Sequence, residues 1–202
     1  MGTGAVCFSA SMNLNMSDNT LIVVGISGSP ATPSRSRTLL GLALDVCEAG
    51  GAESRVVDLA SLPADALLGR GDPSALDDVR NLVARSHLLI ASTPVYRATY
   101  SGLLKVFFDQ LPLGALSGKV ALGIATGGSA RHAGVLEFGL RPLFTSLDAV
   151  VPFPGLHALD AQFTGTAPSA QLQERLTQLV RDTSAVAVTL AGPVPTAIAQ
   201  ET

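Results

Sequence analysis

Short apolar runs alternate with segments of helical spacing along most of this 202-residue chain. The runs are rich in β-branched residues and have the length of buried parallel strands, whereas the segments between them place apolar residues three or four positions apart. This alternation predicts an α/β fold, a three-layer sandwich in which a five-stranded parallel sheet has helices on both faces. The predicted strands cover residues 21–27, 54–58, 87–92, 119–125 and about 149–154.

The predicted topology places three polar loops at one edge of the sheet. Right-handed crossovers between five strands most simply give the order 2-1-3-4-5. Ligands bind such sheets beyond the carboxyl ends of the strands, where the winding direction reverses. The loops after strands 1, 3 and 4 meet there, at residues 27–36, 93–100 and 126–131, and each is rich in Gly, Ser, Thr, Pro or Tyr. We therefore expect a polar crevice between these loops.

Two predicted helices have clear apolar stripes. Between the first two strands, Leu40, Leu44 and Cys47 lie four and three residues apart, and Gly50-Gly51 is a stop signal. The last helix follows a linker at residues 163–168, and we expect it to pack on the sheet near the fifth strand. Its apolar positions are Leu172, Leu176, Leu179 and Val180.

The composition is that of one domain. The chain is long enough for a substantial core and too short for two domains of ordinary size. Hydrophobic residues make up 47% and charged residues only 14%, so we expect a homo-oligomer in which another subunit covers part of the surface. The domain is expected at residues 21–190, between a disordered N-terminal extension at 1–20, where Met12 or Met16 is an alternative start, and a C-terminal tail at 191–202.

Charge and cysteine usage exclude several classes of partner. The net charge is -3 and the 13 Lys and Arg residues form no basic cluster, which excludes DNA and RNA as main partners. Cys7 and Cys47 belong to no metal-ligand spacing and no CxxC pair, which indicates reduced thiols and no metal site. The sequence has neither a signal-peptide pattern nor a run of about 18 apolar residues, so we expect a cytoplasmic protein without membrane association.

The loop after the first strand has the residues of a phosphate-binding site. The strand ends at Ser27-Gly28-Ser29-Pro30, and a helix is expected to begin near Ser36. The unpaired amides and the positive dipole end of that helix would face the loop. The alternative interpretation is a plain turn with solvated arginines. A phosphate monoester would receive hydroxyls from Ser27, Ser29, Ser34 and Ser36, and charge from Arg35 or Arg37.

The other two loops suit a planar heterocycle. Tyr96 and Tyr100, the only tyrosines of the chain, lie in the proline-stiffened loop after the third strand, where their rings can cover an apolar surface. The glycines within residues 125–129 permit close approach of the backbone from the other side. The alternative interpretation is a tight turn with two boundary aromatic residues.

Three sequence blocks carry a resemblance to a known family. They are GISGSPATPSRS, TPVYRATYSGLLKVFFDQLP, and GKVALGIATGGSARH followed by LRPLF, and the middle block is the most specific. Over residues 21 to 160 the chain resembles the NAD(P)H-dependent FMN reductases of the flavodoxin-like superfamily, especially those that serve sulfonate-type flavin monooxygenases. The resemblance implies a flavodoxin-like fold.

The resemblance also implies FMN as the flavin and NADPH or NADH as the hydride donor. Hydride passes from nicotinamide C4 to flavin N5 when the two rings stack, so the protein positions the rings, and we expect neither a catalytic side chain nor a metal. Tyr100, Arg131 and His132 lie close enough to these loops to contact nicotinamide, although His132 has a helix-capping or surface role as its alternative.

Matched by position, the resemblance assigns three groups of residues around FMN. Ser27, Ser29, Arg35, Ser36 and Arg37 would surround the phosphate. Thr93, Pro94, Val95 and Tyr96 would line the flavin ring, and Thr126, Gly127, Gly128 and Ser129 would line its far side.

One departure from the family concerns assembly. Sulfonate-linked members often carry a tyrosine where this chain has Phe138, and its hydroxyl is associated with a subunit contact and with flavin retention. The resemblance implies a homodimer or homotetramer, and an FMN-dependent monooxygenase that receives reduced flavin.

Several alternatives share the predicted fold. A response regulator needs acidic residues where this chain has Ser27-Gly28 and Ser92-Thr93, and neither a P-loop nor a complete GxSxG motif is present. A flavoenzyme that passes electrons from bound FMN to a quinone, azo compound or metal oxyanion stays open, as does a flavodoxin-type electron carrier, which is typically more acidic.

Overall fold

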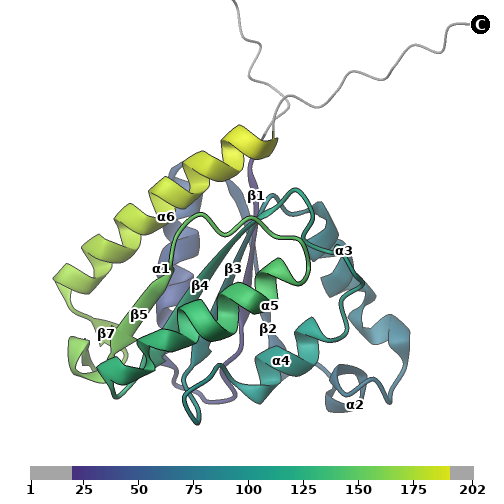
Figure 1. The fold of residues 1–202 in the computed structure, drawn as a ribbon, viewed down its shortest axis with the longest axis horizontal. Coiled ribbons are helices and arrows are strands. Elements are labelled where there is room, and N and C mark those ends of the chain that lie inside the picture. The colour runs from purple at the N-terminus through teal and green to yellow at the C-terminus, as the bar shows by residue number, and fades with distance from the viewer. Residues whose placement is uncertain (1–19, 192–202) are drawn as a thin grey trace, which may run out of the picture.

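The computed structural model describes residues 20–191 and confirms the predicted architecture (Figure 1). Within these residues lies a five-stranded parallel sheet with the predicted order β2-β1-β3-β4-β5. The predicted extension and tail fall almost wholly outside the described residues, as does Cys7. The strands are β1 (Ile22–Ser27), β2 (Glu53–Asp58), β3 (Leu88–Pro94), β4 (Val120–Gly127) and β5 (Leu156–Leu159).

Helices cover both faces of the sheet, as a parallel sheet requires. On one face, α1 (Arg35–Ala49) packs beside the long helix α6 (Ala170–Ala191). The other face is covered by α3 (Asp77–Arg85), α4 (Gly102–Phe108) and α5 (Arg141–Thr145). Shorter elements are η1 (Leu59–Ser61), α2 (Ala64–Leu67), η2 (Pro73–Leu76), η3 (Ala130–Ala133), the π-helix η4 (Leu136–Leu140) and η5 (Asp160–Gln162).

The central strand β1 shows why these runs are almost continuously apolar. Val24 and Ile26 face the layer of α3, α4 and α5, whereas Val23 faces α1 and α6, and all three side chains are fully buried. Because successive side chains of a strand point to opposite faces, a strand covered on both faces needs apolar residues at every position. Burial on both sides therefore fixes β1 in the middle of the molecule.

Helix α1 begins at Arg35, beside its expected start near Ser36, and ends at the predicted stop signal. Ser34 caps the N-terminus, where its hydroxyl accepts a hydrogen bond from the amide of Arg37 at 3.3 Å. At the other end Gly50 is the C-cap, and Gly51 adopts a φ of 87°, a conformation that favours glycine. The positive end of the helix thus lies at the carboxyl edge of the sheet, beside the loop after β1.

The last helix also matches its predicted stripe. Leu172, Leu176 and Val180 of α6 are buried, and Leu179 is partly buried against the same core. The helix packs on α1, β4 and β5, so the expected contact near the fifth strand is confirmed. None of the helices among residues 20–191 is long and apolar enough to cross a membrane, and no group of three or more potential metal ligands occurs there.

The predicted fifth strand at about 149–154 is wrong in position. Val150 forms only an isolated bridge with Val120, and the strand itself begins at Leu156. Pro152 and Pro154 lack the amide hydrogens that a ladder needs, and Gly155 turns the chain with a φ of 86°. The supposed linker at 163–168 is instead an antiparallel ribbon of β6 (Phe163–Thr164) and β7 (Ala167–Pro168).

The protein is expected to lose stability in acid through His87, which precedes β3. Its Nδ1 accepts a hydrogen bond from the amide of Ile22 at 3.0 Å, and burial, with a smaller effect of Lys119, lowers the pKa of His87. The folded-state pKa therefore lies below the unfolded value of about 6.5, so this stability is complete above about pH 6.5 and falls as pH drops toward the folded pKa.

Urea unfolding of the wild type and of His87→Gln at neutral and mildly acidic pH measures this effect. We expect a smaller acid-induced shift in the variant, with a residual shift from His157, whose pKa burial also lowers. Identical pH dependence in the two proteins would contradict a contribution of His87.

Candidate functional site

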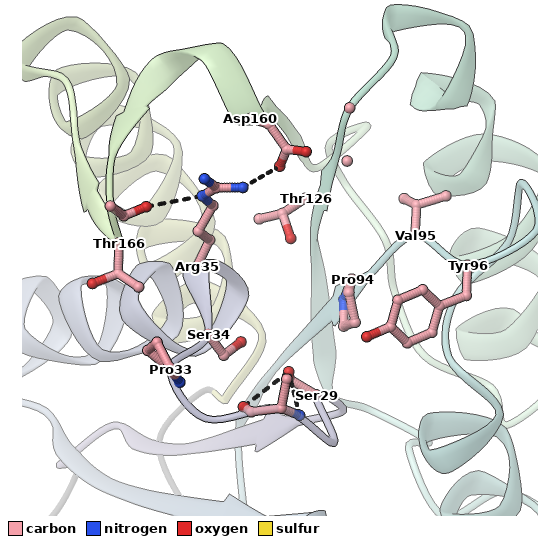
Figure 2. Close-up of a pocket in the computed structure, with 14 residues that line it drawn as sticks. Ser29, Pro33, Ser34, Arg35, Pro94, Val95, Tyr96, Thr126, Asp160 and Thr166 are labelled. Carbon is pink, nitrogen blue, oxygen red and sulfur yellow. Dashed lines mark hydrogen bonds and ion pairs between the residues drawn. The ribbon is translucent and has the colours of Figure 1, made fainter.

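A pocket of about 680 Å³ opens at the carboxyl edge of the sheet (Figure 2). Its walls come from the loops after β1, β3 and β4, as predicted, and from the segment after β5. A volume in the range of about 300 to 1,000 Å³ is typical of sites for small organic ligands. The lining residues are Ser29, Ala31, Pro33, Ser34, Arg35, Pro94, Val95, Tyr96, Thr126, Gly127, Gly128, Asp160, Gly165 and Thr166.

The first wall has the properties of an anion site. Ser29 and Ser34 line it from the loop between β1 and α1, and the Ser34 hydroxyl lies 3.1 Å from that of Ser36. The first amides of α1 point out of the helix here, and no acidic residue occupies its first turn. The partial positive charge of a helix N-terminus and two hydroxyls therefore face the pocket together.

Arg35, the first residue of α1, brings a full positive charge to this wall. Its Nη1 lies 2.9 Å from the Asp160 carboxylate, and its Nε donates to the carbonyl of Gly165 at 2.9 Å. The guanidinium also lies over the ring of Phe163, 5.6 Å from its centroid. Figure 2 shows Arg35 between Asp160 and the ribbon that carries Thr166. The segment after β5 thus fixes the position of this cation.

The second wall is mostly apolar and flat. Pro94 ends β3, and the amide of Val95 donates to the carbonyl of Thr126 at 2.8 Å, which joins this wall to the third loop. Tyr96 is 47% exposed, and paired backbone hydrogen bonds with Thr99 close the turn that follows it. Its ring lies beside Pro94 in Figure 2. This surface suits the face of a planar ring.

The third wall leaves little room for side chains at two positions. A Cβ on Gly127 would lie 3.3 Å from Cβ of Val95, and a Cβ on Gly128 would lie 3.3 Å from Oδ2 of Asp160. Because these contacts are tighter than ordinary van der Waals contact, the glycines keep the backbone itself at the pocket surface. Together, an anion site at one end and flat walls with exposed backbone at the other fit a phosphorylated flavin such as FMN.

The structure brings eight of the thirteen predicted site residues into this one pocket. They are Ser29, Arg35, Pro94, Val95, Tyr96, Thr126, Gly127 and Gly128.

Ser27, Ser36 and Arg37 from the first loop lie outside the pocket. Ser27 is fully buried at the end of β1, and its hydroxyl has no hydrogen-bond partner among the described residues. Ser36 is buried, and its hydroxyl contacts that of Ser34. Arg37 forms an ion pair with Asp58 and lines a separate groove between α1 and β2.

Thr93 and Ser129 stabilise the loops instead of lining the pocket. The Thr93 hydroxyl accepts from the amide of Ser101 at 2.9 Å and donates to the carbonyl of Pro94 at 2.8 Å. Ser129 caps η3, where its hydroxyl accepts from the amide of Arg131. Both residues therefore hold pocket-lining segments in place.

Tyr100, Arg131 and His132, the residues expected to contact nicotinamide, also lie outside the pocket-lining set. Nδ1 of His132 is buried without a hydrogen-bond partner behind the third loop, 3.5 Å from the position of a Cβ on Gly127. Burial, with a smaller effect of His132, lowers the pKa of His157 on β5, while Asp160 opposes this shift. Tyr100 packs against Gly139 of the π-helix, and burial raises its pKa.

Sequence reasoning missed the contribution of the segment after β5. Asp160, Gly165 and Thr166 line the pocket, yet the misplaced fifth strand ended before Asp160, and Gly165 and Thr166 were predicted to lie in a linker. An acidic residue directly beyond the carboxyl end of a strand is the signal that could have found Asp160, because that edge is where ligands bind.

Known proteins that resemble this chain are FMN reductases, which agrees with the geometry of the pocket. The family model for NADPH-dependent FMN reductase matches residues 21–164. An FMN reductase (NADPH) of Pseudomonas putida is 39% identical over 166 residues, which cover 80% of this chain and 84% of that protein. The NADH-dependent FMN reductase SfnF of Pseudomonas fluorescens is 40% identical, over 71% of this chain and 79% of that protein.

Solved structures show the same fold. The apo form of an NADH:FMN oxidoreductase (EMOB) superposes with a TM-score of 0.76 and 35% identity, over 83% of this chain and 90% of that one. An archaeal flavodoxin, 11% identical over 83% of this chain and 99% of its own, has a TM-score of 0.62 and supports the fold alone. The resemblance seen in the sequence is confirmed, and this chain belongs to the NADPH-dependent FMN reductase family of oxidoreductases.

Proposed function

We propose that this protein uses NADPH or NADH to reduce FMN in the cytoplasm, and that FMN is a diffusible substrate whose reduced form passes to a partner monooxygenase. The pocket carries this proposal, because an anion site and two flat walls converge in one cavity. Membership of the family supports the reaction. The sequence resemblance to reductases that serve sulfonate-type monooxygenases supports the recipient.

In this proposal the first wall holds the phosphate. Ser29, Ser34 and the first amides of α1 donate hydrogen bonds, and Arg35 supplies a charge that can make charge-assisted ones. Ser27 and Ser36 are buried outside the pocket-lining set, so their part is to support the loop, whereas Arg37 pairs with Asp58 in a separate groove and takes no part in the site. The phosphate then anchors one end of the flavin and sets its direction in the pocket.

The flat walls hold the ring. Pro94, Val95 and Tyr96 cover one side, while Thr126 and the glycine pair present backbone to the other. A bound flavin supplies the chemistry, since its N5 accepts hydride from nicotinamide C4. The contribution of the chain is to hold the two reactants in contact and to exclude water, which explains why no acid or base is needed at the reacting atoms.

A panel of electron acceptors tests this function. NADPH and NADH oxidation is followed anaerobically with FMN, FAD, riboflavin and a quinone offered separately. The proposal predicts rapid turnover with free FMN and weaker turnover with riboflavin, which lacks the phosphate. Turnover with the quinone alone would contradict it and indicate the rival flavoenzyme class, whereas no turnover with any acceptor would favour an electron carrier.

We also propose that the protein is a homodimer or homotetramer that uses Phe138 as a contact. This side chain is 85% exposed on η4, although its neighbours Leu136 and Leu140 are buried. Truncation of an apolar side chain at the centre of an interface typically weakens association by about 2 kcal/mol or more. We expect Phe138→Ala to form smaller assemblies and to keep NADPH oxidation.

Light scattering on the wild type and the variant measures the assembly. The matched control is Leu113→Ala, because Leu113 is 94% exposed and lies in a turn outside η4. A monomeric wild type would reject the oligomer, and unchanged assembly of Phe138→Ala would reject the role of Phe138.

A further inference from the structure

We propose that Asp160 weakens the binding of the flavin phosphate at Arg35, so that FMN exchanges readily as a substrate. This inference rests on the proposed function, because it assumes that the first wall of the pocket holds the phosphate. Asp160 follows β5 directly and belongs to none of the sequence motifs that carry the family resemblance.

The carboxylate of Asp160 occupies the part of the wall where an anion would meet Arg35. Oδ1 lies 2.9 Å from Nη1 of Arg35, and Oδ2 would lie 3.3 Å from a Cβ on Gly128. The side chain therefore spans the space between the first and the third wall. In Figure 2 the carboxylate of Asp160 faces the guanidinium, and Thr126 lies on the same side of Arg35.

The charges of the pocket wall make Asp160 a competitor for the phosphate. Among the described lining residues, Arg35 and Asp160 carry the formal charges, and these cancel. A dianionic phosphate must either share the guanidinium with the carboxylate or displace it. The pair is partly exposed, with side-chain exposures of 37% and 47%, so it is weak enough to exchange. Repulsion between the carboxylate and the phosphate remains in both cases.

The alternative role for Asp160 is to orient Arg35 for the phosphate. Two other contacts already hold the guanidinium without help from Asp160. Nε donates to the carbonyl of Gly165 at 2.9 Å, and the ring of Phe163 lies beneath the cation. Removing the charge of Asp160 therefore leaves Arg35 in place, and the net effect of the carboxylate is repulsion.

The substitution Asp160→Asn tests the proposal, because it removes the charge and keeps the shape. Quenching of flavin fluorescence gives the Kd of FMN and of riboflavin for each protein. We expect FMN to bind about tenfold more tightly to the variant at low salt, because the substitution removes the repulsion between the carboxylate and a dianionic phosphate. This gain should shrink as salt screens it, and riboflavin, which has no phosphate, should bind the two proteins alike.

Two further variants serve as a control and as a second test. Asp109→Asn removes the same formal charge from the C-cap of α4, where Asp109 pairs with Lys105 outside the pocket, and should leave both affinities unchanged. Asp160→Ser removes the charge with a smaller side chain and should also tighten FMN binding, which covers the case in which Asp160→Asn folds poorly.

The outcomes separate this inference from the proposed function. Tighter binding of FMN alone by the Asp160 variants supports the inference. Weaker binding of FMN would show that Asp160 positions Arg35, and equal changes for both flavins would show a structural effect, so either result overturns it. If the wild type itself bound FMN no better than riboflavin, the phosphate site assumed by the proposed function would fail as well.

Discussion

Replacement of Arg35 by alanine is expected to raise the Kd for FMN by about 10- to 100-fold, because a hydrogen bond to a charged group contributes roughly 1.5 to 3 kcal/mol. The variant also leaves the Asp160 carboxylate in the pocket wall without its cation, which adds repulsion of the phosphate. Riboflavin should bind the variant nearly as well as the wild type. Fluorescence titration with both flavins measures the difference.

Arg37→Ala is the matched control for this prediction. Arg37 lies two residues further along α1, pairs with Asp58 and lines a different groove. Its removal should leave the Kd for both flavins within about twofold, because its ion pair with Asp58 is partly exposed and lies outside the pocket. If Arg37→Ala weakened FMN binding as much as Arg35→Ala, the placement of the phosphate at Ser29, Ser34 and Arg35 would be wrong.

The substitution Gly155→Ala is expected to destabilise the protein by about 2 to 4 kcal/mol. Gly155 has a φ of 86°, and a Cβ at this position would lie 2.5 Å from the carbonyl oxygen of Gly123 on β4. Backbone strain and a collision with the sheet therefore act together. Because Gly155 leads directly into β5, the substitution should also displace the segment that carries Asp160.

Gly41→Ala provides the opposite case for comparison. Gly41 is exposed in the middle of α1, and a Cβ there would meet nothing within 4 Å. Alanine should stabilise the helix by about 0.5 to 1 kcal/mol relative to glycine. Urea unfolding followed by circular dichroism compares both variants with the wild type. A Gly155→Ala protein as stable as the wild type would contradict the tight turn before β5.

The main features of the fold were predictable because local patterns and global packing agree. The runs that became β1, β3 and β4 are apolar at nearly every position, which is the pattern of strands covered on both faces. The fifth strand was misplaced because residues 149–154 are as apolar as a strand. The two prolines within that run carry the decisive information, since each removes an amide from the ladder.

The sequence did not reveal which side chains of the three loops point into the pocket. The three loops and their meeting point follow from the topology, and eight predicted residues line the pocket. Arg35 and Arg37 both lie at the expected start of the helix near Ser36, and the family resemblance placed both at the phosphate. With the helix beginning at Arg35, residues two positions apart point in nearly opposite directions, so both could not face one pocket.

Contacts made between distant segments were not accessible from the sequence. The ion pair of Arg35 with Asp160 joins the start of α1 to the segment after β5 at the carboxyl edge of the sheet, and its formation depends on how the chain after β5 turns back. Ser27 shows the same limit on a smaller scale. It resembles Ser29 in the sequence, yet it ends a central strand and is fully buried outside the pocket-lining set.

Counting the FMN reduced per subunit under anaerobic conditions tests the central claim most directly. Excess NADPH is mixed with a small amount of protein and a large excess of FMN, and reduced flavin is measured from the loss of flavin absorbance. Our account predicts that many equivalents of free FMN are reduced per subunit, until NADPH or FMN is exhausted. Reduction that stops at one equivalent per subunit would show a retained prosthetic group and contradict FMN as the substrate.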